Sequence, residues 1–78
     1  MVRIAPSLLA ADAGRIETAV EQAAAAGADL LHVDIMDGHF VPNLSFGPSL
    51  VAAVRRLTTL PLDVHLMVRR PASFVPLF

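Results

Sequence analysis

The chain has 78 residues, of which 55% are hydrophobic, a formal net charge of −1 and no cysteine. This composition excludes a disulfide framework and a thiolate metal site, and it offers no basic patch for nucleic acid. No apolar run reaches the roughly 20 residues of a membrane span, and the first residues do not resemble a signal peptide. We therefore expect a cytoplasmic protein of one small domain at most, whose high apolar share is typical of part of a larger core.

Residues 3–9 are predicted to form the first strand. Ala5, Ser7 and Leu9 would share one face of it. Pro6 has no N–H to contribute to a sheet, which suits an edge or the end of a strand. Ser7 lies near the carboxyl end, where its small hydroxyl acts either as a turn or helix cap or as part of a site.

Residues 14–26 space their apolar side chains by three and four, as an amphipathic helix does. Asp12 is predicted to cap the amino end of this helix, and Gly27 its carboxyl end. The packing side is rich in alanine, so the helix can approach a sheet closely.

Residues 30–36 are predicted to form the central strand, followed by a turn that Asp37 caps. Side chains alternate between the two faces of a strand. One face therefore carries His32, Asp34 and Met36, whereas the opposite face is continuously apolar. A histidine and an aspartate two residues apart at the end of a strand provide either two metal ligands or an oriented acid–base pair.

A second helix is predicted over residues 49–57 after Pro48, and a third strand over residues 62–68. His65 and Met67 share one face of that strand. Two strands thus present a histidine in similar positions, which indicates a shared site.

Two further assignments concern the periphery of that site. Asp63 lies on the same face as His65 but deeper, where it would support a ligand or fill the interior. His39 falls in a loop and is expected to be exposed or to act as a lid contact. At the end of the chain, Ser73 is predicted to cap a third helix with Pro76 in its first turn.

The order of predicted elements is β-α-β-α-β, followed by the beginning of a helix. Strands that alternate with helices imply right-handed units and a parallel sheet. Polar side chains at the carboxyl ends of such strands are typical of the active site of a (β/α)₈ barrel or of the crevice of an open doubly wound sheet. No G-x-G-x-x-G follows the first strand, which argues against a dinucleotide-binding fold.

Four stretches of this sequence closely resemble the ribulose-phosphate 3-epimerase family: APSLLAAD at residues 5–12, HVDIMDGHFVPN at 32–43, FGP at 46–48 and LDVHLMV at 62–68. The resemblance implies that residues 1–78 form the N-terminal part of a single (β/α)₈ TIM barrel, incomplete as given. It also implies the reaction of the family, which interconverts D-ribulose 5-phosphate and D-xylulose 5-phosphate in the pentose phosphate pathway.

The resemblance further implies roles for individual residues. Three residues match ligands of one divalent metal ion: His32, Asp34 and His65. Asp34 also matches one of two catalytic carboxylates. The ligand types suit Zn²⁺, Fe²⁺, Mn²⁺ or Co²⁺ without choosing among them.

Other matched residues contact the substrate. Ser7 matches a serine that touches the sugar phosphate, and His65 lies beside the sugar as well as on the metal. Met36 and Met67 match methionines that crowd the enediolate, although both also suit a role as filler of the core.

A complete barrel takes roughly 200 residues or more. In the family, the second catalytic carboxylate, which is the fourth ligand, and the glycine-rich phosphate site come from later strands, and no residue here matches them. We therefore expect this chain alone to be inactive and the protein to form a homo-oligomer. Two alternatives stay open: an epimerase of a hexulose phosphate such as allulose 6-phosphate, and a non-catalytic barrel fragment.

Overall fold

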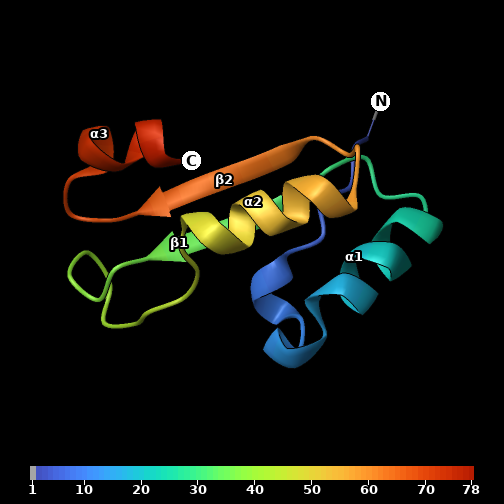
Figure 1. Cartoon of the computed structure of the whole chain (residues 1–78), viewed down its shortest axis with the longest axis horizontal. Coiled ribbons are helices and arrows are strands. Elements are labelled where there is room, and N and C mark those ends of the chain that lie inside the picture. The colour runs from blue at the N-terminus through green and yellow to red at the C-terminus, as the bar shows by residue number, and fades with distance from the viewer. Residues whose placement is uncertain (1) are drawn as a thin grey trace.

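A computed structural model describes residues 2–78 of the chain. Its helices and strands follow in alternating order, and Figure 1 shows them from the N-terminus in blue to the C-terminus in red. The main elements are α1 (Ile16–Ala25), β1 (Leu31–Met36), α2 (Pro48–Leu57), β2 (Leu62–Met67) and α3 (Pro71–Phe74). Short 3₁₀ helices cover Leu8–Ala10, Ala13–Arg15 and Val75–Leu77.

The two strands form a parallel sheet, with α2 as the crossover between them. Both arrowheads in Figure 1 point to the same end of the molecule, where the loop after β1 and helix α3 also lie. Parallel strands joined by a helix confirm the predicted α/β class and fit a segment of a (β/α)₈ barrel.

The core lies on the face of the sheet that α1 and α2 cover. Leu31, Val33 and Ile35 of β1 are buried there, as the alternation of apolar residues predicts. The remaining buried side chains come from the helices and the segments that flank the strands: Leu8, Val20, Val51, Val54 and Val68. The opposite face of the sheet has no such cover within residues 2–78.

The carboxyl end of the first helix is capped as the sequence predicts, whereas at the amino end α1 itself begins after Arg15, which makes no side-chain capping bond, and Asp12 caps the preceding turn. The Asp12 carboxylate accepts a hydrogen bond from the Gly14 N–H at 2.9 Å, which caps the 3₁₀ turn that leads into α1. At the other end Gly27 has a φ of +90°. There the N–H groups of Gly27 and Ala28 bond the carbonyls of Ala24 and Ala23, which is a Schellman motif.

The predicted first strand is wrong in its extent. Residues 3–7 run beside β1, but only Ser7 forms a parallel bridge, to His32, and the chain then turns into the 3₁₀ helix at Leu8. The His32 N–H bonds the Pro6 carbonyl at 2.9 Å, whereas Pro6 has no N–H to return. On the side away from β1, no strand within residues 2–78 pairs with this segment.

The predicted third helix is also corrected. Helix α3 begins at Pro71 with Arg70 at its N-cap, so Ser73 lies inside the helix and does not cap it. Pro76 falls within the 3₁₀ helix that follows. Proline at the first helical position is pre-organised for a helix start, which explains the earlier beginning.

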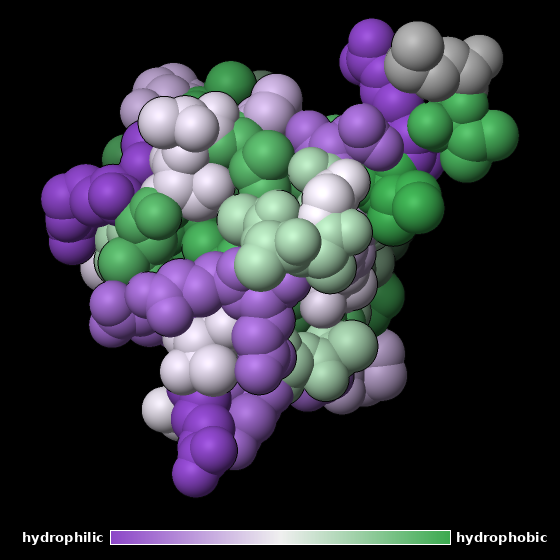
Figure 2. Space-filling view, turned by 90° about the vertical axis from the view of Figure 1, so that its right-hand side faces the viewer, coloured by the Kyte–Doolittle hydropathy of each residue, from purple (hydrophilic) through white to green (hydrophobic). Residues whose placement is uncertain are grey.

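Apolar residues lie among polar ones on the end of the molecule shown in Figure 2, where the N-terminal segment projects.

Between residues 2 and 78, none of the helices has the length and apolar character needed to cross a membrane.

Candidate metal centre

The register of the two strands brings the predicted site residues together. Asp34 of β1 is paired with His65 of β2, and His32 is paired with Asp63. Paired residues of neighbouring strands point to the same face. All four side chains therefore lie on the face opposite the apolar core.

Asp34 is the centre of this cluster. Its Oδ1 accepts hydrogen bonds from His32 Nε2 at 2.9 Å and from His65 Nδ1 at 3.2 Å. The other ring nitrogen of His32, Nδ1, donates to Asp63 Oδ2 at 2.8 Å. Asp63 thus orients His32 from behind, as the sequence analysis expects of a supporting carboxylate.

Burial differs across the cluster and sets its electrostatics. The Asp34 side chain is 14% exposed and that of His32 26%, whereas His65 and Asp63 are more than half exposed. The hydrogen bond that His32 donates to Asp63 raises the pKa of His32 above its usual value, and Asp34 adds to the rise. Partial burial of the ring opposes this effect. A doubly protonated imidazole satisfies both carboxylates at once.

The three predicted ligands fit a divalent metal ion. One ligand atom from each of His32, Asp34 and His65 can be chosen so that all lie within 4.8 Å of one another. When each bond to the ion is about 2.1 Å long, neighbouring ligand atoms lie about 3.0 Å apart in octahedral and about 3.4 Å apart in tetrahedral coordination. The separations of 2.9 Å and 3.2 Å in the cluster are close to that range. Two imidazoles and a carboxylate are a donor set that Zn²⁺, Fe²⁺, Mn²⁺ and Co²⁺ accept.

The predicted substrate contacts surround the cluster without bonding to it. Met36 and Met67 form the next pair on the same face of the sheet, beyond Asp34 and His65, and both are half-buried. Ser7 pairs with His32 in the bridge, so it lies beside β1 on the edge that faces away from β2. Its hydroxyl accepts from the Leu9 N–H at 3.2 Å, which is the capping role that the sequence analysis left open.

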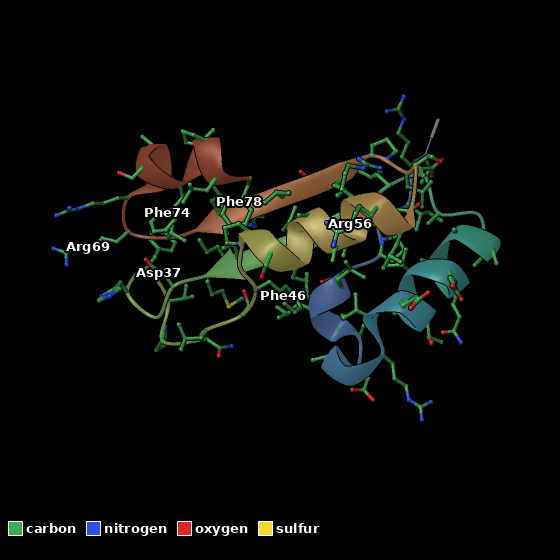
Figure 3. The ribbon with its side chains drawn as sticks, viewed as in Figure 1. Asp37, Phe46, Arg56, Arg69, Phe74 and Phe78 are labelled. Atoms are coloured by element: carbon green, nitrogen blue, oxygen red, sulfur yellow. The ribbon has the colours of Figure 1, made fainter. Side chains whose placement is uncertain are left out.

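Asp37 has a structural role that the sequence predicts only in part. Its Oδ1 accepts from the N–H groups of His39 and Phe40, as a turn cap does. Its Oδ2 also accepts from the Arg69 N–H at 2.9 Å, which ties the loop after β1 to the turn after β2. In Figure 3, Asp37 lies next to the turn that carries Arg69. These N–H groups, that of Arg69 first, lower the pKa of Asp37 to about 2.

Ser45 is a residue at the site that the sequence analysis missed. Its hydroxyl donates to the Asp34 carbonyl at 2.6 Å and accepts from the Met36 N–H at 2.9 Å. No local pattern marks this serine, because it meets β1 only after the intervening loop has folded back. Its position directly before the Phe-Gly-Pro start of α2 is the one signal in the sequence.

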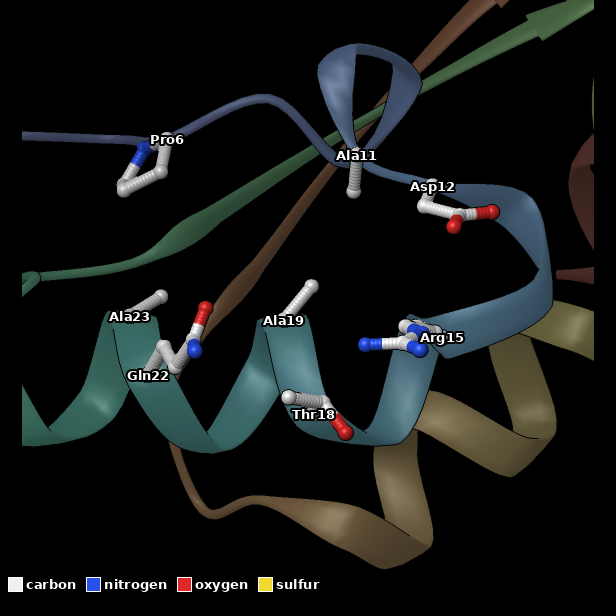
Figure 4. Close-up of a pocket in the computed structure, with 8 residues that line it drawn as sticks. All are labelled: Pro6, Ala11, Asp12, Arg15, Thr18, Ala19, Gln22 and Ala23. Atoms are coloured by element: carbon white, nitrogen blue, oxygen red, sulfur yellow. The ribbon is translucent and has the colours of Figure 1, made fainter.

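A hollow of about 460 Å³ lies elsewhere, between the N-terminal segment and α1. Figure 4 shows Pro6, Ala11 and Asp12 on one side of it and α1 residues on the other. None of its lining residues belongs to the His–Asp–His cluster. This hollow therefore takes no part in the site.

The fold and the cluster define a class of protein: a parallel α/β chain with a His–Asp–His cluster on the face of its strands opposite the helices. The chain belongs to the ribulose-phosphate 3 epimerase family, whose model matches residues 3–78. This confirms the resemblance noted in the sequence.

Curated relatives agree with that assignment. The chain is 49% identical over 78 residues to the ribulose-phosphate 3-epimerase of Bacillus subtilis (strain 168), covering 100% of this chain and 36% of the relative. It is 49% identical over 77 residues to ribulose-phosphate 3-epimerase 1 of Cupriavidus necator, covering 99% and 32%. It is 48% identical over 75 residues to the ribulose-phosphate 3-epimerase of Methanocaldococcus jannaschii, covering 96% and 32%. The chain thus spans about a third of the length of these relatives.

Proposed function

We propose that this chain is the N-terminal part of a cytoplasmic ribulose-phosphate 3-epimerase of the pentose phosphate pathway, a homo-oligomer that interconverts D-ribulose 5-phosphate and D-xylulose 5-phosphate. The observation that carries the proposal is the His32–Asp34–His65 cluster, held in register by two parallel strands within a chain of this family. The remaining strands of the barrel would supply the second carboxylate and the phosphate site.

In this proposal His32, Asp34 and His65 hold one divalent metal ion. The ion would act as a Lewis acid and stabilise negative charge that develops on the oxygens of the substrate. His32 would offer Nε2 as the ligand atom, because its Nδ1–H is already held by Asp63. The Nε2 proton that now bonds Asp34 would leave on binding, so the affinity for the metal should rise with pH.

Asp34 is proposed as the base that takes the proton from C3 of the substrate. Both imidazoles engage its Oδ1, whereas the described residues make no hydrogen bond to its Oδ2. Oδ2 is therefore free to receive a proton while Oδ1 holds its position. The carboxylate is mostly buried, which keeps it close to the strand and away from competing water.

Ser7, Met36 and Met67 are proposed to line the substrate pocket around Asp34. The two methionines form a soft apolar border on one side of the cluster, and Ser7 adds a hydroxyl on the side of His32. An apolar border beside a base disfavours water at the reacting carbon.

The test is epimerisation by the protein as encoded, including whatever follows Phe78. We expect conversion of D-ribulose 5-phosphate in a coupled D-xylulose 5-phosphate assay, with solvent deuterium entering at C3. D-Allulose 6-phosphate serves as the competing substrate. A larger kcat/KM for the hexulose phosphate would favour the alternative epimerase, and no turnover of either would contradict the proposal.

A further inference from the structure

The backbone of β1 has two edges with different partners. Leu31 bonds toward β2, with its N–H on the Pro61 carbonyl at 3.0 Å. The N–H of His32 bonds the opposite way, to Pro6 of the N-terminal segment. Because backbone groups alternate along a strand, those of Asp34 and Met36 face the same way as those of His32.

The N-terminal segment leaves this edge before it reaches Asp34. At Leu8 the chain turns into a 3₁₀ helix, and the Leu8 carbonyl bonds the Ala11 N–H. The edge beside Asp34 and Met36 would then lack a partner inside the fold. Backbone groups in that position need one, because an unpaired buried amide or carbonyl is costly.

Beyond the point where the N-terminal segment turns away, Ser45 provides the hydrogen-bond partners for this edge of β1. Its hydroxyl joins the Asp34 carbonyl at 2.6 Å and the Met36 N–H at 2.9 Å, and its own N–H bonds the Met36 carbonyl at 3.3 Å. The preceding Leu44 forms an antiparallel bridge with Asp37. One serine therefore bonds the edge of β1 at the Asp34 carbonyl and at both backbone groups of Met36, directly after the residue that presents its carboxylate to the cluster.

We infer that Ser45 is a positioning residue that fixes the backbone of Asp34, and through it the carboxylate, for metal binding and proton transfer. This inference rests on the proposed function for its consequences. The geometry behind it does not depend on that function, because the Ser45 hydroxyl contacts the backbone of Asp34 and Met36 and none of the ligand atoms. Ser45 thus acts on the site from the edge of the strand.

Removal of the hydroxyl should loosen Asp34 without removing a ligand. In Ser45→Ala the Asp34 carbonyl and the Met36 N–H lose a partner that water replaces poorly at a half-buried position. Groups that orient metal ligands typically contribute about 10- to 100-fold in affinity for the metal. Ser45→Thr keeps the hydroxyl and should restore most of the affinity. Ser49→Ala is the matched control, because Ser49 is exposed in the first turn of α2.

The experiment compares the protein as encoded with these three variants, and uses Co²⁺ as the probe. Amide exchange of Met36 reports on the hydrogen bond itself. Titration with Co²⁺ and the visible absorption bands of the bound ion report on the ligand geometry, and steady-state kinetics separates kcat from KM. We expect Ser45→Ala to exchange the Met36 amide at least about tenfold faster, to bind Co²⁺ about 10- to 100-fold more weakly with altered bands, and to lose kcat more than KM. Ser45→Thr and Ser49→Ala should resemble the parent.

Two results would overturn the inference. Unchanged exchange at Met36 in Ser45→Ala would show that the hydrogen bond does not hold the strand. Faster exchange with unchanged Co²⁺ affinity and bands would show that Ser45 supports the fold and does not position Asp34. Failure of the proposed function looks different, since the parent itself would then neither bind Co²⁺ nor epimerise.

Discussion

The three histidines of the chain occupy different environments, and this difference allows a controlled test of the metal site. His32 and His65 both donate to Asp34, whereas His39 lies exposed in the loop after β1. We expect His32→Ala and His65→Ala each to reduce the metal content of the encoded protein from one ion per chain to well below one. His39→Ala should keep it. Elemental analysis of the dialysed proteins is the measurement, and equal stoichiometry in all three variants would refute the ligand assignment.

Asp34 combines two proposed roles, as ligand and as base, and an isosteric change separates size from charge. Asp34→Asn keeps the volume of the side chain but cannot accept the C3 proton, so the epimerisation rate should fall by at least about 10²-fold. Deuterium incorporation at C3 should fall in parallel. Asp12→Asn is the control, because asparagine also caps a helix. A near-parental rate in Asp34→Asn would rule Asp34 out as the base.

Much of the site could be predicted at the level of single residues, and one part could not. The period of two in a strand places His32, Asp34 and Met36 on one face, and the second strand repeats the pattern with His65 and Met67. Ser45 escaped prediction because its contact with β1 depends on the path of a loop, for which the sequence has no periodic signal.

Asp37 joins the loop after β1 to the turn after β2. The stability that this carboxylate contributes should depend on pH. The N–H groups of Arg69, His39 and Phe40 lower the pKa of Asp37 from its usual 3.8 to about 2 in the folded state. A lowered pKa stabilises the fold at pH values above about 4, and the contribution is lost as the pH falls toward 2.

We therefore expect the free energy of unfolding, measured by urea denaturation, to decrease between pH 4 and pH 2. In Asp37→Asn the decrease over that interval should be smaller, because asparagine does not titrate and cannot accept from Arg69 as a carboxylate does. The same slope in both proteins would contradict the role of Asp37. Hydrogen exchange at the Arg69 amide should also quicken in the variant.

The secondary structure elements were predictable where local rules act alone. The helix over residues 48–57 and the strands over 31–36 and 62–67 follow from periodicity, and Asp12 and Gly27 from capping rules. The first strand failed because Pro6 has no N–H for the ladder and the chain turns into a 3₁₀ helix at Leu8, so that only Ser7 forms a bridge to β1. Its isolated bridge at Ser7 keeps the register that a longer strand would have.

The whole molecule is more open than a self-contained domain of its size. Its accessible surface is 5263 Å², against about 4,600 Å² expected for a compact monomer of 8.3 kDa. Its radius of gyration is 12.6 Å, against about 11.5 Å expected for 78 residues. Within residues 2–78 the His–Asp–His face and the outer edge of β2 are uncovered, although parallel sheets are normally covered on both faces.

This openness agrees with the proposal that further strands complete the site. In the proposed mechanism the cluster supplies three ligands, one of which is also the base, and an epimerisation also needs an acid on the opposite face of the substrate. We expect the 78 residues produced alone, even when loaded with metal, to show no epimerisation above buffer with the same metal. That expectation leads to a test in which the missing part is supplied.

The most direct measurement uses a chimera in which residues 1–78 replace the matching segment of the Bacillus subtilis ribulose-phosphate 3-epimerase, to which they are 49% identical. The purified chimera is loaded with Co²⁺ and assayed with D-ribulose 5-phosphate, beside the same chimera carrying Asp34→Asn. The account predicts clear turnover by the chimera and a loss of at least about 10²-fold in the Asp34→Asn form. A folded, metal-loaded chimera without turnover, or one in which Asp34→Asn makes no difference, would contradict it.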